Sequence, residues 1–288
     1  DGLRRAQRGA EEQHGGERDH HRARRVDDRG AGRRRHAERD VLNGVEDARA
    51  HDAEEDEHRR VRPDRIVNVL REIDADIIAL QEVLSIDSRN RADNQARFIS
   101  EELGFAYRLG TARQLQGGAY GNVVLSRLPM LAAYHYDVSQ HGREERGCLR
   151  VDVGLDGQQL LHVYNVHLGT AYGERPLQAR RLLDEEIINT QHLLGPRILL
   201  GDFNEWTRGV ASKLLAAHFQ CADLRLHLGR TRTYPGVMPF LHLDHIYYDA
   251  ALEVEAATLH RSRTAVLASD HLPLYTDFHL RSNGSERH

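Results

Sequence analysis

The chain has 288 residues, 40% of them hydrophobic, which is enough to bury a substantial core as one large domain or two small ones. Its formal net charge of −4 argues against a broad electrostatic grip on nucleic acid. No apolar run approaches the roughly 20 residues that cross a bilayer, and no secretory leader opens the sequence. We therefore expect a soluble, cytoplasmic and monomeric protein without a transmembrane segment.

Residues 1–60 differ in composition from the rest of the chain. They contain no aromatic residue and no Ile, Met, Cys, Lys, Ser, Thr or Pro, so they cannot bury a core. Their 15 arginines are matched by 16 acidic residues, which makes the segment a mixed-charge stretch and not a basic arm for DNA. Two interpretations remain open: a disordered segment, or the translation of a wrong reading frame. In both cases we expect one folded domain over residues 61–288, with residues 1–60 outside it.

The remainder of the chain alternates helix and strand patterns. After Pro63, the apolar residues Ile66, Val69, Leu70 and Ile73 recur at helical spacing and predict an amphipathic helix. Several strand-like runs follow one another across short polar turns, so much of the sheet should be antiparallel, with helices packed outside it. The strand-like runs cover 76–81, 122–126, 148–153, 160–167, 197–201, 243–248, 252–259 and 274–280, and further helical patterns cover 94–103, 176–194 and 210–218.

Polar residues of catalytic type lie at the ends of apolar strands in five separate places. A carboxylate such as Glu82, which emerges from a hydrophobic strand, must be ligated, paired or open to solvent, because burying it alone costs several kcal/mol. Residues two apart in a strand point the same way, so Asp202 and Asn204 would present two oxygen ligands to one cavity. Asn165 shares a strand face with His167, and the set that carries the chemistry is Glu82, His167, Asp202, Asn204, Asp244, Asp270 and His271.

This set of side chains favours hydrolysis of phosphoesters. Carboxylate and amide oxygens suit a hard cation such as Mg²⁺ or Mn²⁺, whereas Zn²⁺ would want more histidine or a paired spacing that Cys148 and Cys221 lack. A histidine beside a carboxylate can donate to a phosphoryl oxygen or help to activate water. Neither the G-x-S-x-G motif of serine hydrolases nor a phosphate-binding G-x-x-x-x-G-K-[ST] loop is present.

Six motifs resemble, in order, those of the endonuclease/exonuclease/phosphatase superfamily: QEV (81–83), GNVVLSRLP (121–129), NVHLG (165–169), GDFNEW (201–206), LDHIYYD (243–249) and SDHLP (269–273). The superfamily includes DNase I, abasic-site endonucleases, neutral sphingomyelinases and inositol polyphosphate phosphatases. The resemblance covers about residues 63–280. It implies an α/β fold, a four-layer sandwich of two mostly antiparallel sheets flanked by helices, with the active site at one edge where the loops after the strands converge.

The resemblance also implies roles for individual residues. Glu82 matches the principal Mg²⁺ ligand, and Asp270 matches a second carboxylate near the metal. Asp202 and Asn204 match the pair that orients the attacking water and binds the scissile phosphate. His271 matches the histidine that contacts the phosphate, and Asp244 matches the residue that would hold its tautomer. His167 matches the second histidine, and Glu144 matches the partner of that histidine. Glu144 lies in a segment EERG (144–147), similar to the E-P-R-G segment whose carboxylate partners the second histidine.

The front of the chain departs from the superfamily pattern. Members begin with a strand that ends in a T-Y-N-like motif, whose Asn supports the metal ligand. Asn43 is the only Asn in residues 1–60, and the run of residues around it is too short and not apolar enough for a central strand. We therefore expect the first strand to be missing, which would expose a sheet edge and remove one support for Glu82.

Three functions remain open. The first is a metal-dependent phosphoric ester hydrolase, most simply a phosphodiesterase, in which the metal and a histidine assist attack of water on phosphorus. The second is a DNA or RNA endonuclease of the same fold, although residues 61–288 carry 25 basic against 28 acidic residues. The third is a catalytically impaired binder of a phosphorylated ligand. The partner is a phosphoester in each case, whether in a small molecule, a lipid head group or a nucleic acid.

Overall fold

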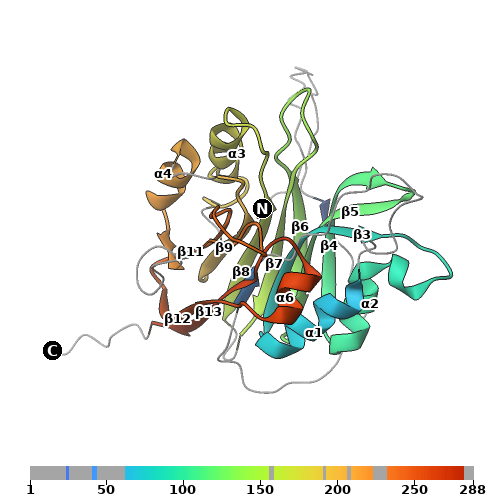
Figure 1. Ribbon diagram of the computed structural model, residues 1–288. Coiled ribbons are helices and arrows are strands. Elements are labelled where there is room, and N and C mark those ends of the chain that lie inside the picture. The colour runs from blue at the N-terminus through green and yellow to red at the C-terminus, as the bar shows by residue number, and fades with distance from the viewer. Residues whose placement is uncertain are drawn as a thin grey trace, which may run out of the picture.

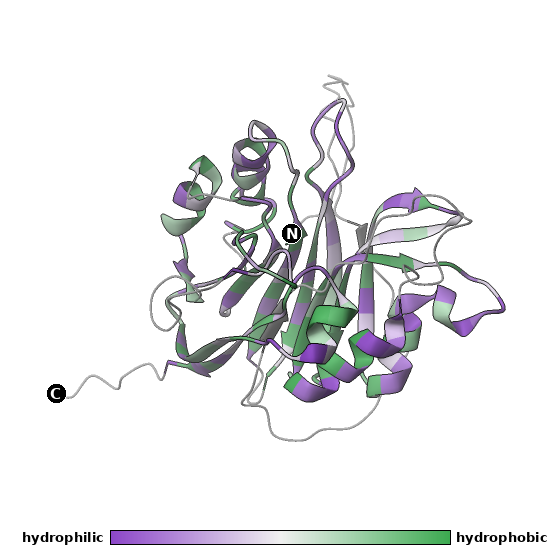
Figure 2. Ribbon diagram, viewed as in Figure 1, coloured by the Kyte–Doolittle hydropathy of each residue, from purple (hydrophilic) through white to green (hydrophobic). Residues whose placement is uncertain are grey.

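The computed structural model describes residues 24–25, 41–43, 62–155, 159–190, 193–205, 209–222 and 232–281. Within these ranges two sheets pack face to face, and helices cover the outer face of each sheet (Figure 1). The apolar strands form the centre of the molecule, while the helices carry polar residues on their outer sides (Figure 2). The four-layer α/β sandwich expected from the sequence is confirmed. No helix in the described ranges is long and apolar enough to span a bilayer.

The seven-stranded sheet has the order β1-β6-β7-β8-β9-β11-β10. Its neighbours are antiparallel except for β8 and β9, which are parallel. Helices α3 (Glu174–Leu182) and α4 (Val210–Ala216) cover its outer face and pack Leu182 and Leu215 against Tyr164. The strands are β1 (Arg24–Arg25), β6 (Met130–Asp137), β7 (Gly147–Gly154), β8 (Leu160–His167), β9 (Arg197–Asp202), β10 (Gln220–Cys221) and β11 (Asp244–Tyr248).

The six-stranded sheet has the order β12-β13-β2-β3-β5-β4. Its outer face is covered by α1 (Pro63–Ile73), α2 (Gln95–Leu103) and α6 (Arg263–Ala268), with a short 3₁₀ turn, η1 (Arg91–Asp93), before α2. The strands are β2 (Val41–Asn43), β3 (Ile77–Ser85), β4 (Ala106–Leu115), β5 (Gly118–Ser126), β12 (Leu252–Leu259) and β13 (Leu274–Leu280).

Helix α1 follows from its sequence. Pro63 occupies its first turn, where a missing backbone N–H costs nothing, and Asp74 ends it in the left-handed conformation, with its N–H bonded to the Leu70 carbonyl. The predicted apolar stripe, which includes Ile66 and Val69, is buried against the six-stranded sheet. The helix predicted after Pro63 is confirmed.

The front of the chain contributes more to the fold than its composition predicts. Strand β2 lies between β13 and β3, antiparallel to the first and parallel to the second, with Asn43 opposite Ala79. Strand β1 adds to the edge of the other sheet beside β6. The expectation that residues 1–60 lie wholly outside the fold, and that the first strand is missing, is therefore wrong at 24–25 and 41–43. Three residues suffice because β3 and β13 each offer backbone groups for pairing. The other residues of 1–61 are outside the described ranges.

A buried amide cluster joins the two sheets. Asn165 of β8 donates hydrogen bonds to the carbonyls of Leu80 and Val123 in the other sheet, at 2.8 and 2.9 Å. It also accepts one from Gln81 Nε2 at 2.7 Å, and Asn122 donates to the Asn165 carbonyl at 3.1 Å. Asn165 and Gln81 are fully buried, so these bonds replace the hydrogen bonds to water that the amides lose on folding. The cluster fixes the spacing of the sheets directly beneath the candidate site.

Candidate active site

Three neighbouring strands of the seven-stranded sheet place polar side chains side by side. His167, the last residue of β8, is in register with Asp202 at the end of β9, and Asp202 is in register with Asp244 at the start of β11. Residues in register point to the same face. That face looks towards the six-stranded sheet, because Leu200 and Ile246, two positions along, belong to the core between the sheets. His167 Nε2 lies 3.7 Å from Asp202 Oδ2.

Glu82 reaches this row from the opposite sheet through an irregularity in β3. The pairing of β3 with β5 shifts register between Leu80 and Val83, and Glu82 has a left-handed φ of 58°. Regular alternation after the inward-facing Gln81 would turn Glu82 towards the helices. The bulge keeps its carboxylate between the sheets, where Oε1 lies 3.9 Å from His167 Nδ1. Bulges that redirect a side chain are common beside active sites.

A sharp turn follows β9. Asp202 Oδ1 accepts a 2.7 Å hydrogen bond from the backbone N–H of Asn204, whose φ is 49°. Asn204 Nδ2 in turn donates to the Leu168 carbonyl at 2.9 Å, just beyond His167. The two residues are therefore neighbours, but a side-chain-capped turn brings them together and not the alternation of an extended strand. The turn holds the Asp202 carboxylate, which is only 1% exposed, in one orientation.

Gly201 permits the close pairing of β8 and β9 beside Asp202. Its φ is 143°, and a Cβ added there would lie 1.9 Å from the Val166 carbonyl oxygen. We expect Gly201→Ala to lower the free energy of unfolding by about 3 kcal/mol or more, because strain and a backbone clash add. Urea denaturation measures this, with Gly142→Ala as the matched control. Gly142 also has a positive φ, 71°, but a Cβ there meets nothing within 4 Å, so equal losses in both variants would contradict the clash.

His271 completes the row from the side of the six-stranded sheet. Its Nδ1 lies 2.8 Å from Asp244 Oδ2, and both residues are essentially buried. Tyr234 packs against the imidazole, with ring centroids 4.9 Å apart. Because a carboxylate only accepts, His271 Nδ1 carries the proton of this hydrogen bond. The contact that the sequence predicted between Asp244 and His271 is present.

His167 differs from its expected arrangement. Glu144 does not pair with it directly: Glu144 accepts a 2.8 Å hydrogen bond from Arg146 Nη2 and pairs with Arg113 Nη1 at 2.7 Å. The guanidinium of Arg146 is buried and needs an anionic partner, which is Glu144. Its other terminal nitrogen, Nη1, lies 3.3 Å from His167 Nδ1. A guanidinium only donates, so His167 Nδ1 accepts and the Nε2 proton points towards Asp202. The predicted direct contact between Glu144 and His167 is therefore corrected: Arg146 lies between them. Arg146 belongs to the same EERG motif, but the motif does not show how far its side chain reaches.

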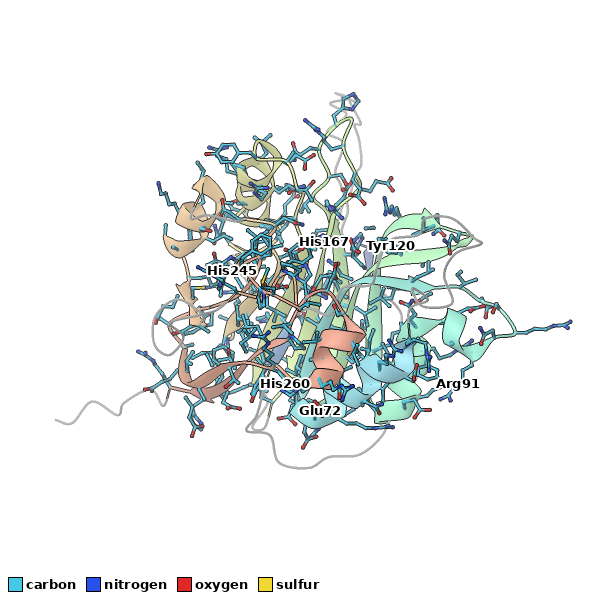
Figure 3. The ribbon with its side chains drawn as sticks, viewed as in Figure 1. Glu72, Arg91, Tyr120, His167, His245 and His260 are labelled. Atoms are coloured by element: carbon cyan, nitrogen blue, oxygen red, sulfur yellow. The ribbon has the colours of Figure 1, made fainter. Side chains whose placement is uncertain are left out.

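His167, labelled in Figure 3, lies near the upper strand ends in this view, on the same side as Tyr120 of β5. Asp270 lies on the turn just before His271 and is exposed, with its backbone carbonyl accepting from Gly236 N–H at 2.7 Å. Contacts and strand register therefore connect Glu82, His167, Asp202, Asn204, Asp244 and His271, while Asp270 precedes His271 in the chain and Glu144 reaches His167 only through Arg146.

A second buried Asp–His pair lies on the opposite face of the seven-stranded sheet. His162 Nδ1 is 2.7 Å from Asp152 Oδ1, and Arg150 Nε is 3.1 Å from the same oxygen. Burial raises the pKa of the nearby Tyr136 to about 12. This pair has the local chemistry of Asp244 and His271 without their position, which makes it an internal control for mutagenesis.

The carboxylates of the candidate site differ in how far solvent reaches them. The Glu82 side chain is 21% exposed, whereas Asp202 and Asp244 are engaged and buried. In the described part of the chain, no group of three or more His, Cys, Asp or Glu side chains could hold a metal by itself. Mg²⁺ commonly binds through one or two carboxylates, waters and the substrate phosphate, and does not need such a cage.

The sequence profile of the Endonuclease/Exonuclease/phosphatase family matches residues 42–271. The chain belongs to this family. It is also 32% identical over 233 residues to the protein named "Uncharacterized protein YbhP" of Escherichia coli (strain K12), covering 77% of this chain and 90% of that protein. The profile begins within β2, in agreement with the place of that strand in the sheet.

Solved structures share the fold at low sequence identity. A mannosyl-6-phosphatase of Bacteroides thetaiotaomicron VPI-5482 superposes with a TM-score of 0.69 at 15% identity, covering 84% of this chain and 99% of that one. The human Nocturnin catalytic domain with bound sulfate anion gives a TM-score of 0.67 at 19% identity, covering 90% and 98%. At these identities the likeness supports the fold alone.

Proposed function

We propose that this protein hydrolyses phosphoester bonds, phosphodiesters in particular, with Mg²⁺ or Mn²⁺ bound beside Glu82. The observation that supports this most strongly is the continuous series of contacts from Glu82 through His167 and Asp202 to Asp244 and His271. It brings acids and imidazoles from both sheets to one gap, as phosphoryl transfer requires. The family of the chain is one whose members usually act on phosphoesters.

Asp202 and Asn204 position and activate the attacking water. The Asp202 carboxylate is held by the Asn204 N–H and lies 3.7 Å from His167 Nε2, so it is oriented before substrate arrives. It accepts the proton that the water loses as the water oxygen bonds to phosphorus, while the P–O ester bond breaks and the released alkoxide takes a proton from solvent. The Asn204 side chain, fixed to the Leu168 carbonyl, lies where it can hydrogen-bond the scissile phosphate.

His271 stabilises negative charge on the phosphoryl oxygens. Asp244 accepts the Nδ1 proton of His271, and in the protonated imidazole the Nε2–H donates to a phosphoryl oxygen. Arg146 fixes the tautomer of His167, so that its Nε2–H is directed towards the Asp202 carboxylate. When bound, the divalent cation supplies charge neutralisation at the phosphate, and Glu82 with Asp270 would hold it. The mannosyl-6-phosphatase of similar fold acts on a phosphorylated sugar by its name, which supports phosphoester chemistry on this scaffold.

Hydrolysis of bis-p-nitrophenyl phosphate, plasmid DNA and a phospholipid, each with Mg²⁺, with Mn²⁺ and with EDTA, tests the proposal. We expect metal-dependent release from the small diester, abolished by EDTA and restored by excess Mg²⁺. Asp202→Ala serves as the blank. Metal-dependent cleavage of equal rate in this variant would overturn the mechanism, and cleavage of plasmid DNA alone would favour the endonuclease alternative.

A further inference from the structure

A loop ahead of β11 exposes large apolar side chains. Val237 and Met238 are each 73% exposed and Phe240 is 56% exposed, within four residues of one another. Single exposed apolar residues are ordinary on protein surfaces, but a cluster marks an interaction site. The loop is held in shape by hydrogen bonds from Phe240 N–H and Leu241 N–H to the Tyr234 carbonyl, at 2.9 and 2.8 Å. The exposure is therefore built into the fold.

The loop is fixed to the rim of the candidate active site. Gly236 N–H donates to the Asp270 carbonyl at 2.7 Å, and Leu272 N–H donates to the Thr233 carbonyl at 2.9 Å. These bonds place the apolar tip directly beside the turn that carries His271. Whatever covers the tip must therefore approach the molecule on the side of the site.

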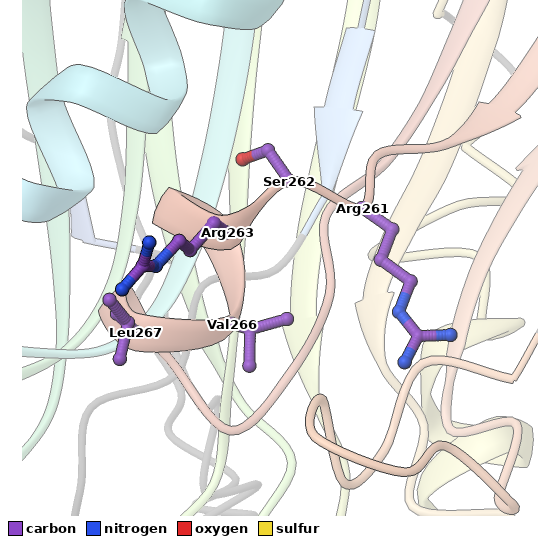
Figure 4. Close-up of a pocket in the computed structure, with 5 residues that line it drawn as sticks. All are labelled: Arg261, Ser262, Arg263, Val266 and Leu267. Carbon is purple, nitrogen blue, oxygen red and sulfur yellow. The ribbon is translucent and has the colours of Figure 1, made fainter.

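Two arginines continue this surface. Arg261 Nη2 donates to the Val237 carbonyl at 3.2 Å, and Arg261 and Arg263 both line an open cavity of about 410 Å³ with Val266 and Leu267. Figure 4 shows the two guanidinium groups on either side of Val266. Leu267 is 58% exposed. Neither arginine forms an ion pair within the described residues, so their charge is available to an anionic partner.

We propose that this surface docks on an anionic phospholipid bilayer. The rim patch consists of Val237, Met238, Phe240, Leu267, Arg261 and Arg263. In a bilayer, acyl chains lie beneath a layer of anionic phosphates. The exposed apolar side chains of the rim patch would contact the acyl chains, and its two arginines, which have no carboxylate partner among the described residues, would contact the phosphates. A bilayer on the rim patch brings phosphodiester head groups to the side of the active site. Docking itself is independent of catalysis, whereas delivery of a lipid substrate rests on the proposed function.

Co-sedimentation of the full chain with lipid vesicles tests the docking. We expect binding to vesicles of phosphatidylcholine mixed with phosphatidylglycerol, and much weaker binding to phosphatidylcholine alone. Arg261→Gln and Arg263→Gln should each weaken binding roughly fivefold, the contribution of one basic side chain near an anionic surface. Phe240→Ser should weaken it roughly tenfold by removing apolar area from the interface.

Matched controls are Arg89→Gln and Leu131→Ser, which change an exposed arginine and a 58% exposed leucine outside the rim patch. All variants should keep the wild-type Tm and the wild-type rate on bis-p-nitrophenyl phosphate. Three results would overturn the docking: no sedimentation of the wild type with mixed vesicles, equal binding by patch and control variants, or a wild-type dimer that patch substitutions dissociate. Vesicle binding without any hydrolysis would retain the docking and reject the proposed function.

Discussion

Asp202→Asn should lower kcat/KM for bis-p-nitrophenyl phosphate by about a thousandfold, the scale of a lost general base. The amide has the shape of the carboxylate and its oxygen can still accept from Asn204 N–H, so the turn after β9 is kept. What disappears is the negative charge that accepts the water proton. The measurement is steady-state hydrolysis at saturating Mg²⁺, with thermal unfolding of the same samples to show that the fold survives.

The control for this substitution lies at the other end of the same strand pair. Asp249 follows β11, and its carboxylate accepts a 2.9 Å hydrogen bond from Arg197 N–H at the start of β9. Asp249→Asn therefore makes the same chemical change in a carboxylate that also caps a backbone N–H, outside the site. We expect its kcat/KM to stay within about threefold of wild type. Similar losses in the two variants would show that the Asp202 effect is structural.

Asp244→Asn should lower kcat/KM by about a hundredfold to ten-thousandfold. The neutral amide can donate to His271 Nδ1, which favours the wrong tautomer of the imidazole, and the substitution removes the anion that accepts the Nδ1 proton. His271→Gln should have an effect of the same order, and the double variant should lose little more, because the two residues act as one unit. Initial rates for the three variants provide the test.

The Asp152–His162 pair on the opposite face of the sheet is the control that distinguishes a loss of catalysis from a loss of stability. Asp152→Asn breaks a buried contact with His162 of nearly the same length, 2.7 Å against 2.8 Å. We expect it to lower the free energy of unfolding by about 1–3 kcal/mol, as a buried hydrogen-bonded charge requires, and to leave kcat/KM within about threefold of wild type. A loss of activity as large as that of Asp244→Asn would contradict the assigned role of Asp244.

Much of the fold was predictable because its strands and first helix are apolar and periodic. β8, β12 and β13 have the bounds that were predicted. β4 was missed because its side chains are mostly half-buried or exposed, which leaves no apolar run to detect. The helix predicted to extend to residue 194 ends at Leu182, although Ile187 and Ile188 beyond it are buried. A turn can bury apolar residues at helical spacing as well as a helix does, and periodicity does not distinguish the two.

The candidate site was predictable as a set of residues but not as a set of contacts. Strand ends in neighbouring positions explain why His167, Asp202 and Asp244 meet. The bulge at Glu82 lies beside the hydrogen bond from Gln81 to Asn165, 84 positions away in the sequence, and the local sequence pattern indicates neither feature. Arg146 was overlooked for a related reason: the choice between Glu144 and Arg146 as the neighbour of His167 depends on which side chain reaches furthest into the gap.

Strand β2 has a consequence for how the two halves of the catalytic apparatus stay aligned. Glu82 belongs to the strand on one side of β2, and His271 leads into the strand on the other side. The three residues of β2 thus connect the strand that carries Glu82, the proposed metal ligand, to the strand that follows His271. Deleting residues 1–61 would remove β2 and its pairing with β3 and β13. The amide hydrogens of β13 should then exchange faster with solvent, while those of β5 stay protected. Catalytic turnover should fall at temperatures below the Tm of the domain.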